Sequence, residues 1–379
     1  MNVKTLALAA AAAAAATSAQ AADLPLAAEP VNYVKACDAF GAGYFQLPGK
    51  DTCIKLGGRI RAQYVSHDLN EGLGNSFDRD DNGVADVDSK GDVKKNNYSS
   101  YVRGYLYFTS MTATDFGTIK TYTEFQGEWS GAGAAEDTKT NDAWVQLGAD
   151  YGSFLFGREG SAFDGFTGYT WIGPVGGWWS DQATLQASFT GDLGNGVTAT
   201  ASIEDSSYRG GEENAVDFVG ALKVAQGWGS FQLAGAAHNK ADGDDYGYAI
   251  GATAVVNLDM VKEGTEFTFQ AQYANEAGTY LGVSNDDIDS YDVKGYNLSA
   301  GIETALTEKV SAQLDLAYLS VEEISTDTDY VDFTVNGSVV YSPVSGLGLA
   351  LAAGWGQEEI DGDKLDDEIK VGARVQYTF

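Results

Sequence analysis

The residue types that most often carry catalysis are scarce in this chain of 379 residues. It holds two histidines, His67 and His238, and neither falls in a zinc spacing, a Ser/His/Asp order or a phosphate-binding loop. Carboxylates are so frequent in the acidic segments that no one pair stands out as a general acid and base. The sequence therefore predicts a protein that is not an enzyme and that requires no cofactor.

One acidic stretch, "DRDDNGVADVDSKGD", could supply oxygen ligands to a metal. Its spacing matches the start of an EF-hand loop, in which alternating oxygen-bearing side chains and a glycine surround calcium. The candidate ligands are Asp78, Asp80, Asn82, Asp86 and Asp88. However, Ser89 stands where a bidentate glutamate is expected, and no flanking helices are predicted. Weak calcium binding and a merely solvated acidic loop therefore both stay open.

Residues 1–21 are typical of a cleaved secretory signal peptide. An apolar run follows Lys4, and "SAQA" offers a cleavage site after Ala21. A membrane helix is the alternative, but the run is too short and an acidic segment follows it. Exported chains usually oxidise nearby cysteines, so Cys37 and Cys53 are predicted to form a disulfide rather than a redox or metal pair.

The charge balance is strongly acidic, with 23 Lys and Arg against 54 Asp and Glu and a net charge of -31. This balance argues against nucleic acid as a partner, because phosphate contacts need basic patches. The chain is rich in Gly (47) and Tyr (21), and long helical patterns are missing, which favours an all-β fold.

From residue 53 onward, segments of alternating apolar and polar residues repeat to the end of the chain. Short glycine-rich connections alternate with longer acidic ones, as in a membrane barrel, and about 16 segments can be counted. They lie near residues 53–66, 97–113, 117–130, 139–149, 152–158, 182–192, 196–206, 214–226, 229–239, 246–259, 264–274, 292–305, 309–322, 328–342, 346–358 and 365–379. The prediction is an all-β, 16-stranded antiparallel transmembrane barrel over residues 53–379, preceded by a periplasmic segment of residues 22–52.

The last residues, "KVGARVQYTF", place Val371, Val375, Tyr377 and Phe379 on one face of a strand. In a closed barrel the last strand pairs with the first, so Phe379 would sit among interfacial aromatic residues with its carboxylate in water. The ending also resembles the terminal signature that the barrel assembly machinery reads. On this stretch alone, an ordinary C-terminal strand stays open.

Residues 34–61 resemble the N-terminal signature of the alphaproteobacterial general porins. The positions that carry the resemblance are Cys37, Asp38, Phe40, Gly41, Gly43, Pro48, Gly49, Thr52 and Cys53. The family implies a trimeric, 16-stranded outer-membrane porin whose third external loop folds into the pore. Its implied surroundings are outer-membrane lipids and lipopolysaccharide, and its implied solutes are ions and small hydrophilic molecules.

Residues 159–181 form the third long connection, which is aromatic and glycine-rich where the others are acidic. Such a segment is expected to pack against protein rather than lie in water. The resemblance implies a constriction inside the barrel, with Glu159, Asp164 and Asp181 as candidate acids facing the pore. Packing on a neighbouring subunit is the alternative.

The register of the first, second and last segments turns cations to the inside of the barrel. They are Arg59, Arg61, Arg103, Lys370 and Arg374, and Arg158 ends the segment before the aromatic loop. On the lipid side each charge would cost about 2–4 kcal/mol at the midplane. A basic strip facing an acidic loop would create a transverse field that filters ions. Scattered salt bridges among solvated lumen residues are the alternative.

These observations predict a general diffusion porin that passes ions and small hydrophilic solutes down their gradients. A sugar-selective porin, with Trp171 and Trp178 as an aromatic track, is one alternative. A surface β-protein that binds ligands through its acidic loops, without a channel, is another. The overall charge favours mild cation selectivity, although the basic strip acts in the opposite direction.

Overall fold

The computed structural model describes residues 35–66, 69, 98–130, 137–175, 177, 179–240, 245–283, 292–365 and 367–379. The predicted signal peptide, the candidate calcium ligands from Asp78 to Asp88 and Trp178 lie outside these residues. Within the described residues, no group of three or more His, Cys, Asp or Glu side chains could hold a metal ion. Calcium binding at 78–88 stays a prediction, and a calcium titration followed by the melting temperature would test it.

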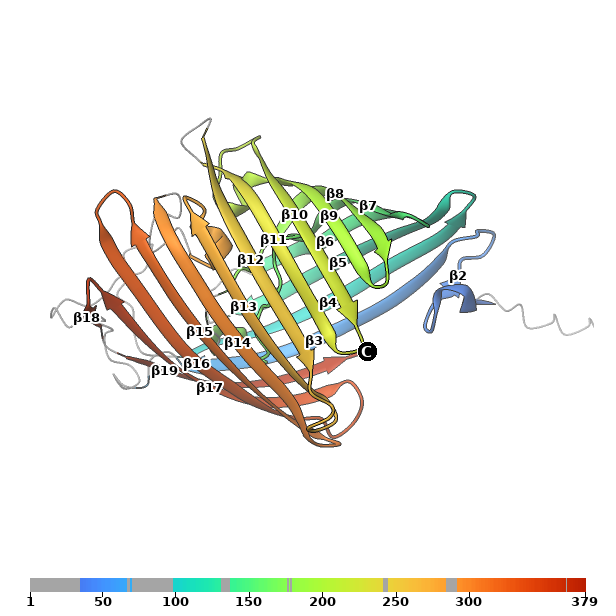
Figure 1. Ribbon diagram of the computed structural model, residues 1–379. Coiled ribbons are helices and arrows are strands. Elements are labelled where there is room, and N and C mark those ends of the chain that lie inside the picture. Colours follow the sequence, from blue (N-terminus) through green and yellow to red (C-terminus); the bar gives the residue numbers. More distant parts are fainter. Residues whose placement is uncertain are drawn as a thin grey trace, which may run out of the picture.

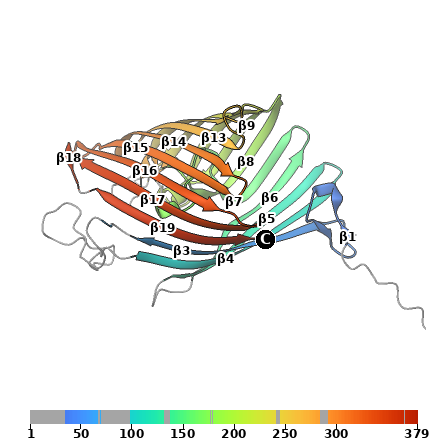
Figure 2. The same cartoon turned by 90° about the horizontal axis from the view of Figure 1, so that it is seen from below.

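Sixteen long strands of the described chain form one closed antiparallel sheet, which confirms the predicted barrel (Figures 1 and 2). They are β3 (Cys53–Ser66), β4 (Tyr98–Thr114), β5 (Gly117–Ser130), β6 (Asp137–Ala149), β7 (Gly152–Gly160), β8 (Ala183–Gly194), β9 (Val197–Asp205), β10 (Val216–Gln226), β11 (Gly229–Asn239), β12 (Tyr246–Asn257), β13 (Thr265–Asn275), β14 (Val293–Thr307), β15 (Val310–Glu323), β16 (Thr328–Tyr341), β17 (Leu347–Ile360) and β19 (Glu368–Thr378), with the two-residue β18 (Asp363–Lys364) beside β17. Each long strand pairs with the next, and β19 pairs with β3, with Arg374 opposite Gln63. This last pairing closes the ring.

Alternation along the strands sorts side chains onto two faces. On β3, Leu56, Ile60 and Tyr64 are at least 50% exposed on the outer face, whereas Gln63 and Val65 on the opposite parity are buried. Apolar side chains therefore gather on the outside and polar ones turn inward, as a lipid environment requires.

Tight turns join the strands at one end of the barrel, and longer connections join them at the other (Figure 1). In the β8–β9 turn, Asn195 and Gly196 both take positive φ values, 53° and 75°, as the favoured two-residue hairpins do. The long connections carry the short 3₁₀ helices η2 (Gly173–Val175), η3 (Ser206–Arg209) and η4 (Gly278–Leu281). In the described part of the chain, no helix is long and apolar enough to cross a membrane.

The two ends of the described chain lie at the end of the barrel that has the tight turns (Figures 1 and 2). Short elements precede the barrel, namely β1 (Lys35–Ala36), η1 (Asp38–Phe40) and β2 (Phe45–Gln46). The predicted disulfide joins Cys37 to Cys53, whose Cα atoms are 6.1 Å apart. Phe379 extends the closing strand pair, because its backbone N–H and C=O both bond to Gly58 at 3.0 Å.

Two apolar clusters form on the inward side of the strands. One joins Phe163 to Tyr280 and Leu281 of η4 and to alanine, valine and leucine side chains of β10 to β15. The other consists of Val65, Ile172, Val175 and Ala352. Both clusters include residues of the connection between β7 and β8, called below the β7–β8 segment (residues 161–182).

Candidate functional site

Side chains on β13 and β15 hold the backbone of the β7–β8 segment. Asp315 accepts hydrogen bonds from the backbone N–H groups of Tyr169 and Thr170, at 2.9 and 2.6 Å. Gln270 accepts a bond from the N–H of Phe166 at 2.9 Å. These acceptors satisfy backbone groups that would otherwise need water, so the segment has a defined path across the strands.

Small residues on the strands make room for large side chains of the same segment. A Cβ added to Gly301 would lie 2.5 Å from the Phe166 ring and 2.7 Å from the Tyr169 ring. A Cβ added to Gly348 would collide with the Trp171 ring. Equivalent close contacts occur at Gly251 with Phe163, at Gly354 with Val175 and at Gly372 with Ile172. The β7–β8 segment is therefore close-packed against the inward face of these strands. Added side-chain volume at the glycines would force the segment to move.

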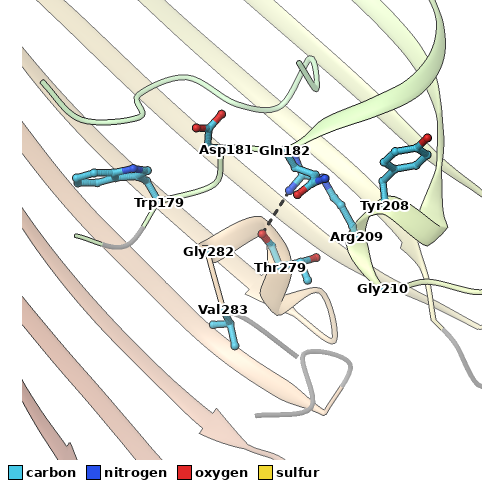
Figure 3. Close-up of a pocket in the computed structure, with 9 residues that line it drawn as sticks. All are labelled: Trp179, Asp181, Gln182, Tyr208, Arg209, Gly210, Thr279, Gly282 and Val283. Carbon is cyan, nitrogen blue, oxygen red and sulfur yellow. Dashed lines mark hydrogen bonds between the residues drawn. The ribbon is translucent and has the colours of Figure 1, made fainter. Parts of the chain in front are cut away.

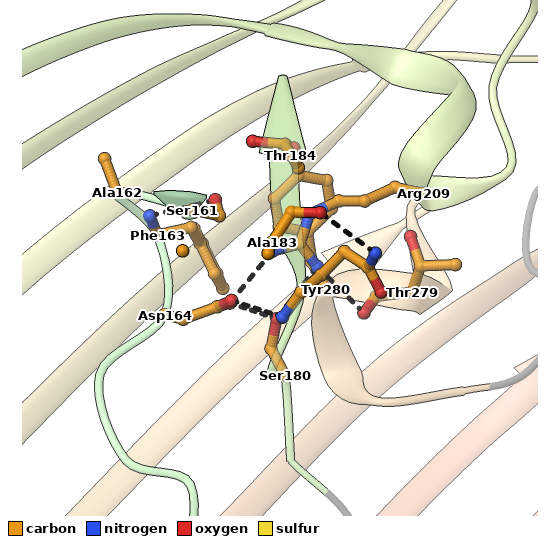
Figure 4. Close-up of polar contacts among 12 residues, drawn as sticks. Ser161, Ala162, Phe163, Asp164, Ser180, Ala183, Thr184, Arg209, Thr279 and Tyr280 are labelled. Carbon is orange, nitrogen blue, oxygen red and sulfur yellow. Dashed lines mark hydrogen bonds and ion pairs between the residues drawn. The ribbon is translucent and has the colours of Figure 1, made fainter. Parts of the chain in front are cut away.

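Asp164, near the start of the segment, pairs with Arg209 of η3 (Figure 4). Its Oδ1 lies 2.9 Å from the Arg209 guanidinium and also accepts a bond from the Ser180 hydroxyl, while Oδ2 accepts from the Gln182 N–H at 2.7 Å. The Arg209 side chain is 1% exposed. This differs from the prediction of a free acid on the pore surface, because a buried arginine neutralises Asp164 and the contacts join the two ends of the segment.

A polar pocket of about 340 Å³ adjoins this pair, between the β7–β8 segment and η4 (Figure 3). Arg209 donates to the Thr279 carbonyl at 3.3 Å beside it, and Asp181 lies on its lining. Partial burial and the neighbouring Asp164 carboxylate raise the pKa of Asp181, while Arg209 acts in the opposite direction. Among the three predicted acids, only Asp181 is both exposed as a whole residue and outside the strands.

Arg209 also links the segment to a buried network on β10 and β11. Its guanidinium carbon lies 4.0 Å from the centre of the Tyr280 ring, and the Tyr280 hydroxyl donates to Asp217 at 2.7 Å. The same Asp217 oxygen is 2.8 Å from Nδ1 of His238. Burial raises the pKa of Tyr280 well above its usual value, so its hydroxyl keeps the proton that it donates.

The cations predicted on β3 and β4 share the inward face of neighbouring strands. Arg61 and Arg103 are direct partners in the register, and Arg59 lies over the Tyr105 ring with its guanidinium carbon 3.9 Å from the ring centre. Arg103 is paired with Glu128, so part of its charge is neutralised. Arg59 and Arg61 are therefore the cations of this group whose charge is least neutralised by a neighbouring acid.

Arg374 has a different role from the one predicted. The residue is 7% exposed, its Nε donates to Gln63 at 2.8 Å, and its guanidinium bonds to the carbonyl of Trp171. It therefore anchors the β7–β8 segment to the β19–β3 seam instead of presenting a charge to the lumen.

Two other predicted cations also stand apart from the strip. Lys370 is paired with Glu368 at 2.6 Å. Arg158 bonds to the carbonyl of Asn141 and lies 3.5 Å from Asp142, in a register opposite Ala143. Each is held by a local acid or carbonyl, so neither adds to the charge around Arg59 and Arg61.

Acids on the strands, rather than on the β7–β8 segment, lie nearest these cations. Glu124 and Glu128 on β5 are register partners of Tyr107 and Arg103 on β4. Asp142 on β6 is opposite Glu124, at a bulge in the β5–β6 pairing. Glu159 lines the same cavity as Asp142, so it is the one predicted acid that joins this group.

Sequence reasoning missed Arg209, Gln270 and Asp315 as anchors of the segment. Asp315 carries a readable signal, because it is a carboxylate at an inward position within the apolar run "QLDLAYL". Glycines at inward positions, such as Gly301, also indicate that something else fills the space. Arg209 carries no such signal, since "SSYRGG" is typical of any polar loop.

Comparison with known proteins now adds independent evidence. A family model described as "Porin subfamily" matches residues 23–378 of the chain. The sequence is 34% identical over 265 residues to porin Omp2a of Brucella melitensis biotype 1, a match that covers 61% of this chain and 65% of that relative. The chain therefore spans slightly less than two thirds of the length of this curated relative.

Two solved structures share the fold over most of the chain. The outer membrane channel DcaP of Acinetobacter baumannii has a TM-score of 0.64 at 15% identity, covering 86% of this chain and 97% of that one. The in-vitro folded trimer form of OmpT from Vibrio cholerae has a TM-score of 0.50 at 12% identity, covering 87% of this chain and 100% of that one. At such low identities these two matches establish the fold alone.

Proposed function

The chain belongs to the porin subfamily and is an integral protein of the bacterial outer membrane, and we propose that it forms a passive diffusion channel for ions and small hydrophilic solutes. The observation that carries the proposal is the division of the barrel into an apolar outer face and a charged inner face. A closed ring of about 16 strands is wide enough to enclose a water-filled channel. Solutes would cross down their own gradients.

We infer that the β7–β8 segment lies inside the barrel and narrows the passage. Its anchors have inward parity: Asp315 lies between Leu314 and Leu316, which are exposed on the outer face. The apolar contacts of Phe163 and Ile172 with buried strand residues support the same placement. The open passage then runs between the segment and the wall formed by β3 to β7.

The charges left open on that wall act on the ion preference in opposite directions. Arg59 and Arg61 attract anions, whereas Asp142 and Glu159, which line the cavity on the same wall, attract cations. Because the two groups oppose each other locally, the overall charge of -31 should decide the sign. We expect mild cation selectivity.

The proposed partners are two further copies of the chain, outer-membrane lipids and lipopolysaccharide, and the barrel assembly machinery. The trimer form of OmpT, which shares the fold, supports self-association into a trimer. Phe379 is 65% exposed at the β19–β3 seam, where an assembly factor could contact it.

Conductance in planar bilayers tests the function. We expect large, ohmic conductance steps that arrive in groups of three. Under a salt gradient, the reversal potential should have the sign that indicates cation selectivity. Well-folded, detergent-extracted protein that produces no steps would contradict the channel and favour a surface protein that binds ligands through its loops. A reversal potential of the opposite sign would assign selectivity to Arg59 and Arg61.

A further inference from the structure

Four aromatic side chains form a continuous row on the inward face of β4, β5 and β6. The ring centres of Tyr105 and Tyr107 are 6.2 Å apart, those of Tyr107 and Tyr122 are 6.4 Å apart, and those of Tyr122 and Trp144 are 5.6 Å apart. The register explains the row, because Tyr122 and Trp144 are direct cross-strand partners. The row faces the side of the barrel that the β7–β8 segment leaves open.

Charged and hydroxyl groups surround the row. Tyr107, Tyr122 and Trp144 line a cavity of about 540 Å³ together with two lysines and two carboxylates, Lys55, Lys120, Asp142 and Glu159. Nζ of Lys120 lies 5.2 Å from the centre of the Trp144 ring. The side chains of the lining carry two positive and two negative formal charges, which balance.

This combination matches one class of solute. Flat aromatic faces in a water-filled passage favour a ligand that has its own apolar face. Balanced ammonium and carboxylate groups can bond the hydroxyl groups around that face, but they attract neither net anions nor net cations. A pyranose ring has this build, with C–H groups on its face, hydroxyls at its edge and no charge.

We propose that the part of this row that lines the cavity, Tyr107–Tyr122–Trp144, is a binding track for neutral pyranose sugars and short sugar oligomers. Tyr105 is buried beneath Arg59 and supports the row from behind. The proposal rests on the proposed channel function, since the sugar must enter the lumen to reach the row. Of the loop aromatics considered for a sugar track, Trp171 is packed against Gly348, and Trp178 lies outside the described residues. Successive rings would let an oligomer move from one ring to the next.

Two measurements test the track, and each has its own readout. Calorimetric titration of the detergent-solubilised protein with maltotriose measures binding without any need for conduction. Bilayer conductance with increasing maltotriose measures whether the bound sugar blocks ion flow. Sorbitol is the control solute, because it has hydroxyl groups but no ring face. We expect saturable binding and block with maltotriose, and neither with sorbitol.

A matched set of variants on β5 separates ring stacking from general packing. Tyr122→Leu removes the ring and should weaken maltotriose binding by about fivefold, the effect of one aromatic contact. Tyr122→Phe keeps the ring and loses only the bond to Glu124, so most of the affinity should return. Phe125→Leu on the outer face of the same strand should bind maltotriose like the unchanged protein.

The outcomes distinguish the track from the channel. Channels that conduct but bind maltotriose no better than sorbitol overturn the track and leave the channel function standing. Equal binding by Tyr122→Leu and Tyr122→Phe also overturns it, because the ring would then contribute nothing. Binding that depends on the Tyr122 ring in a protein without conductance supports the track and overturns the channel.

Discussion

The interior of the barrel has two unlike walls. On the covered wall, β10 to β17, many inward positions hold small or amide-bearing side chains, and the β7–β8 segment and η4 pack against them. On the open wall, β3 to β7, inward positions hold tyrosine, arginine, lysine and glutamate, as in the row around Tyr107. The same strand pattern therefore builds a packing surface on one side and a solvated surface on the other.

The difference offers a reason why, in the placement proposed above, the β7–β8 segment lies on this wall of the barrel and not on the other. A segment brings backbone N–H groups that need acceptors and side chains that need space. Asp315 and Gln270 provide acceptors, and Gly301 and Gly348 provide space. Large ionised side chains leave little space, and covering them would require desolvating their charges.

Asp315→Ala should have the largest effect on the difference between the two walls, because it removes the main hydrogen-bond acceptor that holds the β7–β8 segment on the covered wall. The N–H groups of Tyr169 and Thr170 would lose their acceptor, at a cost of about 1–3 kcal/mol for each buried group. We expect larger and noisier single-channel conductance and a lower denaturation temperature. Asp329→Ala, at an exposed residue of β16, is the control and should change neither property. Unchanged conductance in Asp315→Ala would show that the segment does not depend on this anchor.

Gly348→Ala tests whether space is as important as hydrogen bonding. The new Cβ would collide with the Trp171 ring, and overpacking of this kind costs about 1–3 kcal/mol. The temperature at which the folded barrel loses its electrophoretic mobility should fall. Gly356→Ala, on the same face of β17, meets its nearest atom at an ordinary 3.4 Å and should be nearly neutral. Equal losses in the two variants would show that the space at Gly348 for the Trp171 ring has no special importance.

Substitutions of charged residues on the open wall should change the ion selectivity of the channel and leave its stability nearly unchanged. Arg61→Gln removes a lumen cation and should move the reversal potential toward cation preference, whereas Glu159→Gln, in the lining of the cavity, should move it toward anion preference. Arg374→Gln should move it less than Arg61→Gln, because Arg374 is buried against Gln63. Lys262→Gln, in an exposed turn, is the control. A larger shift from Arg374 than from Arg61 would reverse the assignment of the two residues.

The smallest effect is expected at the edge between the walls, from Asp181→Asn. Burial and Asp164 raise the pKa of Asp181, so the ionised carboxylate disfavours folding above that pKa. The variant should therefore be slightly more stable at about pH 7, and its advantage should vanish as the pH falls and Asp181 takes up a proton. Melting curves across that range, with Asp192→Asn as the control, would measure it. An advantage that grows toward low pH would contradict the sign.

Much of the barrel could be predicted because strand alternation is a local pattern. Predicted and observed bounds agree closely, as for residues 117–130 and β5 (Gly117–Ser130). The parity of Arg61 and Arg103 predicts that both side chains face inward, and the two residues are register partners in the structure. The roles of Asp164 and Arg374 were not predictable, because their partners Arg209 and Trp171 lie 45 and 203 residues away along the chain.

By itself, the sequence determined the closed barrel, its inward and outward faces, the disulfide and the family signature, since each depends on residue order over a short stretch. Only the tertiary structure decided which wall the β7–β8 segment covers. That choice depends on contacts such as Phe166 with Gln270, across 104 residues of chain, and Tyr169 with Asp315, across 146. The β7–β8 segment obtains its hydrogen-bond acceptors and its packing space on the covered wall. The charged residues and the aromatic row of the open wall therefore stay uncovered.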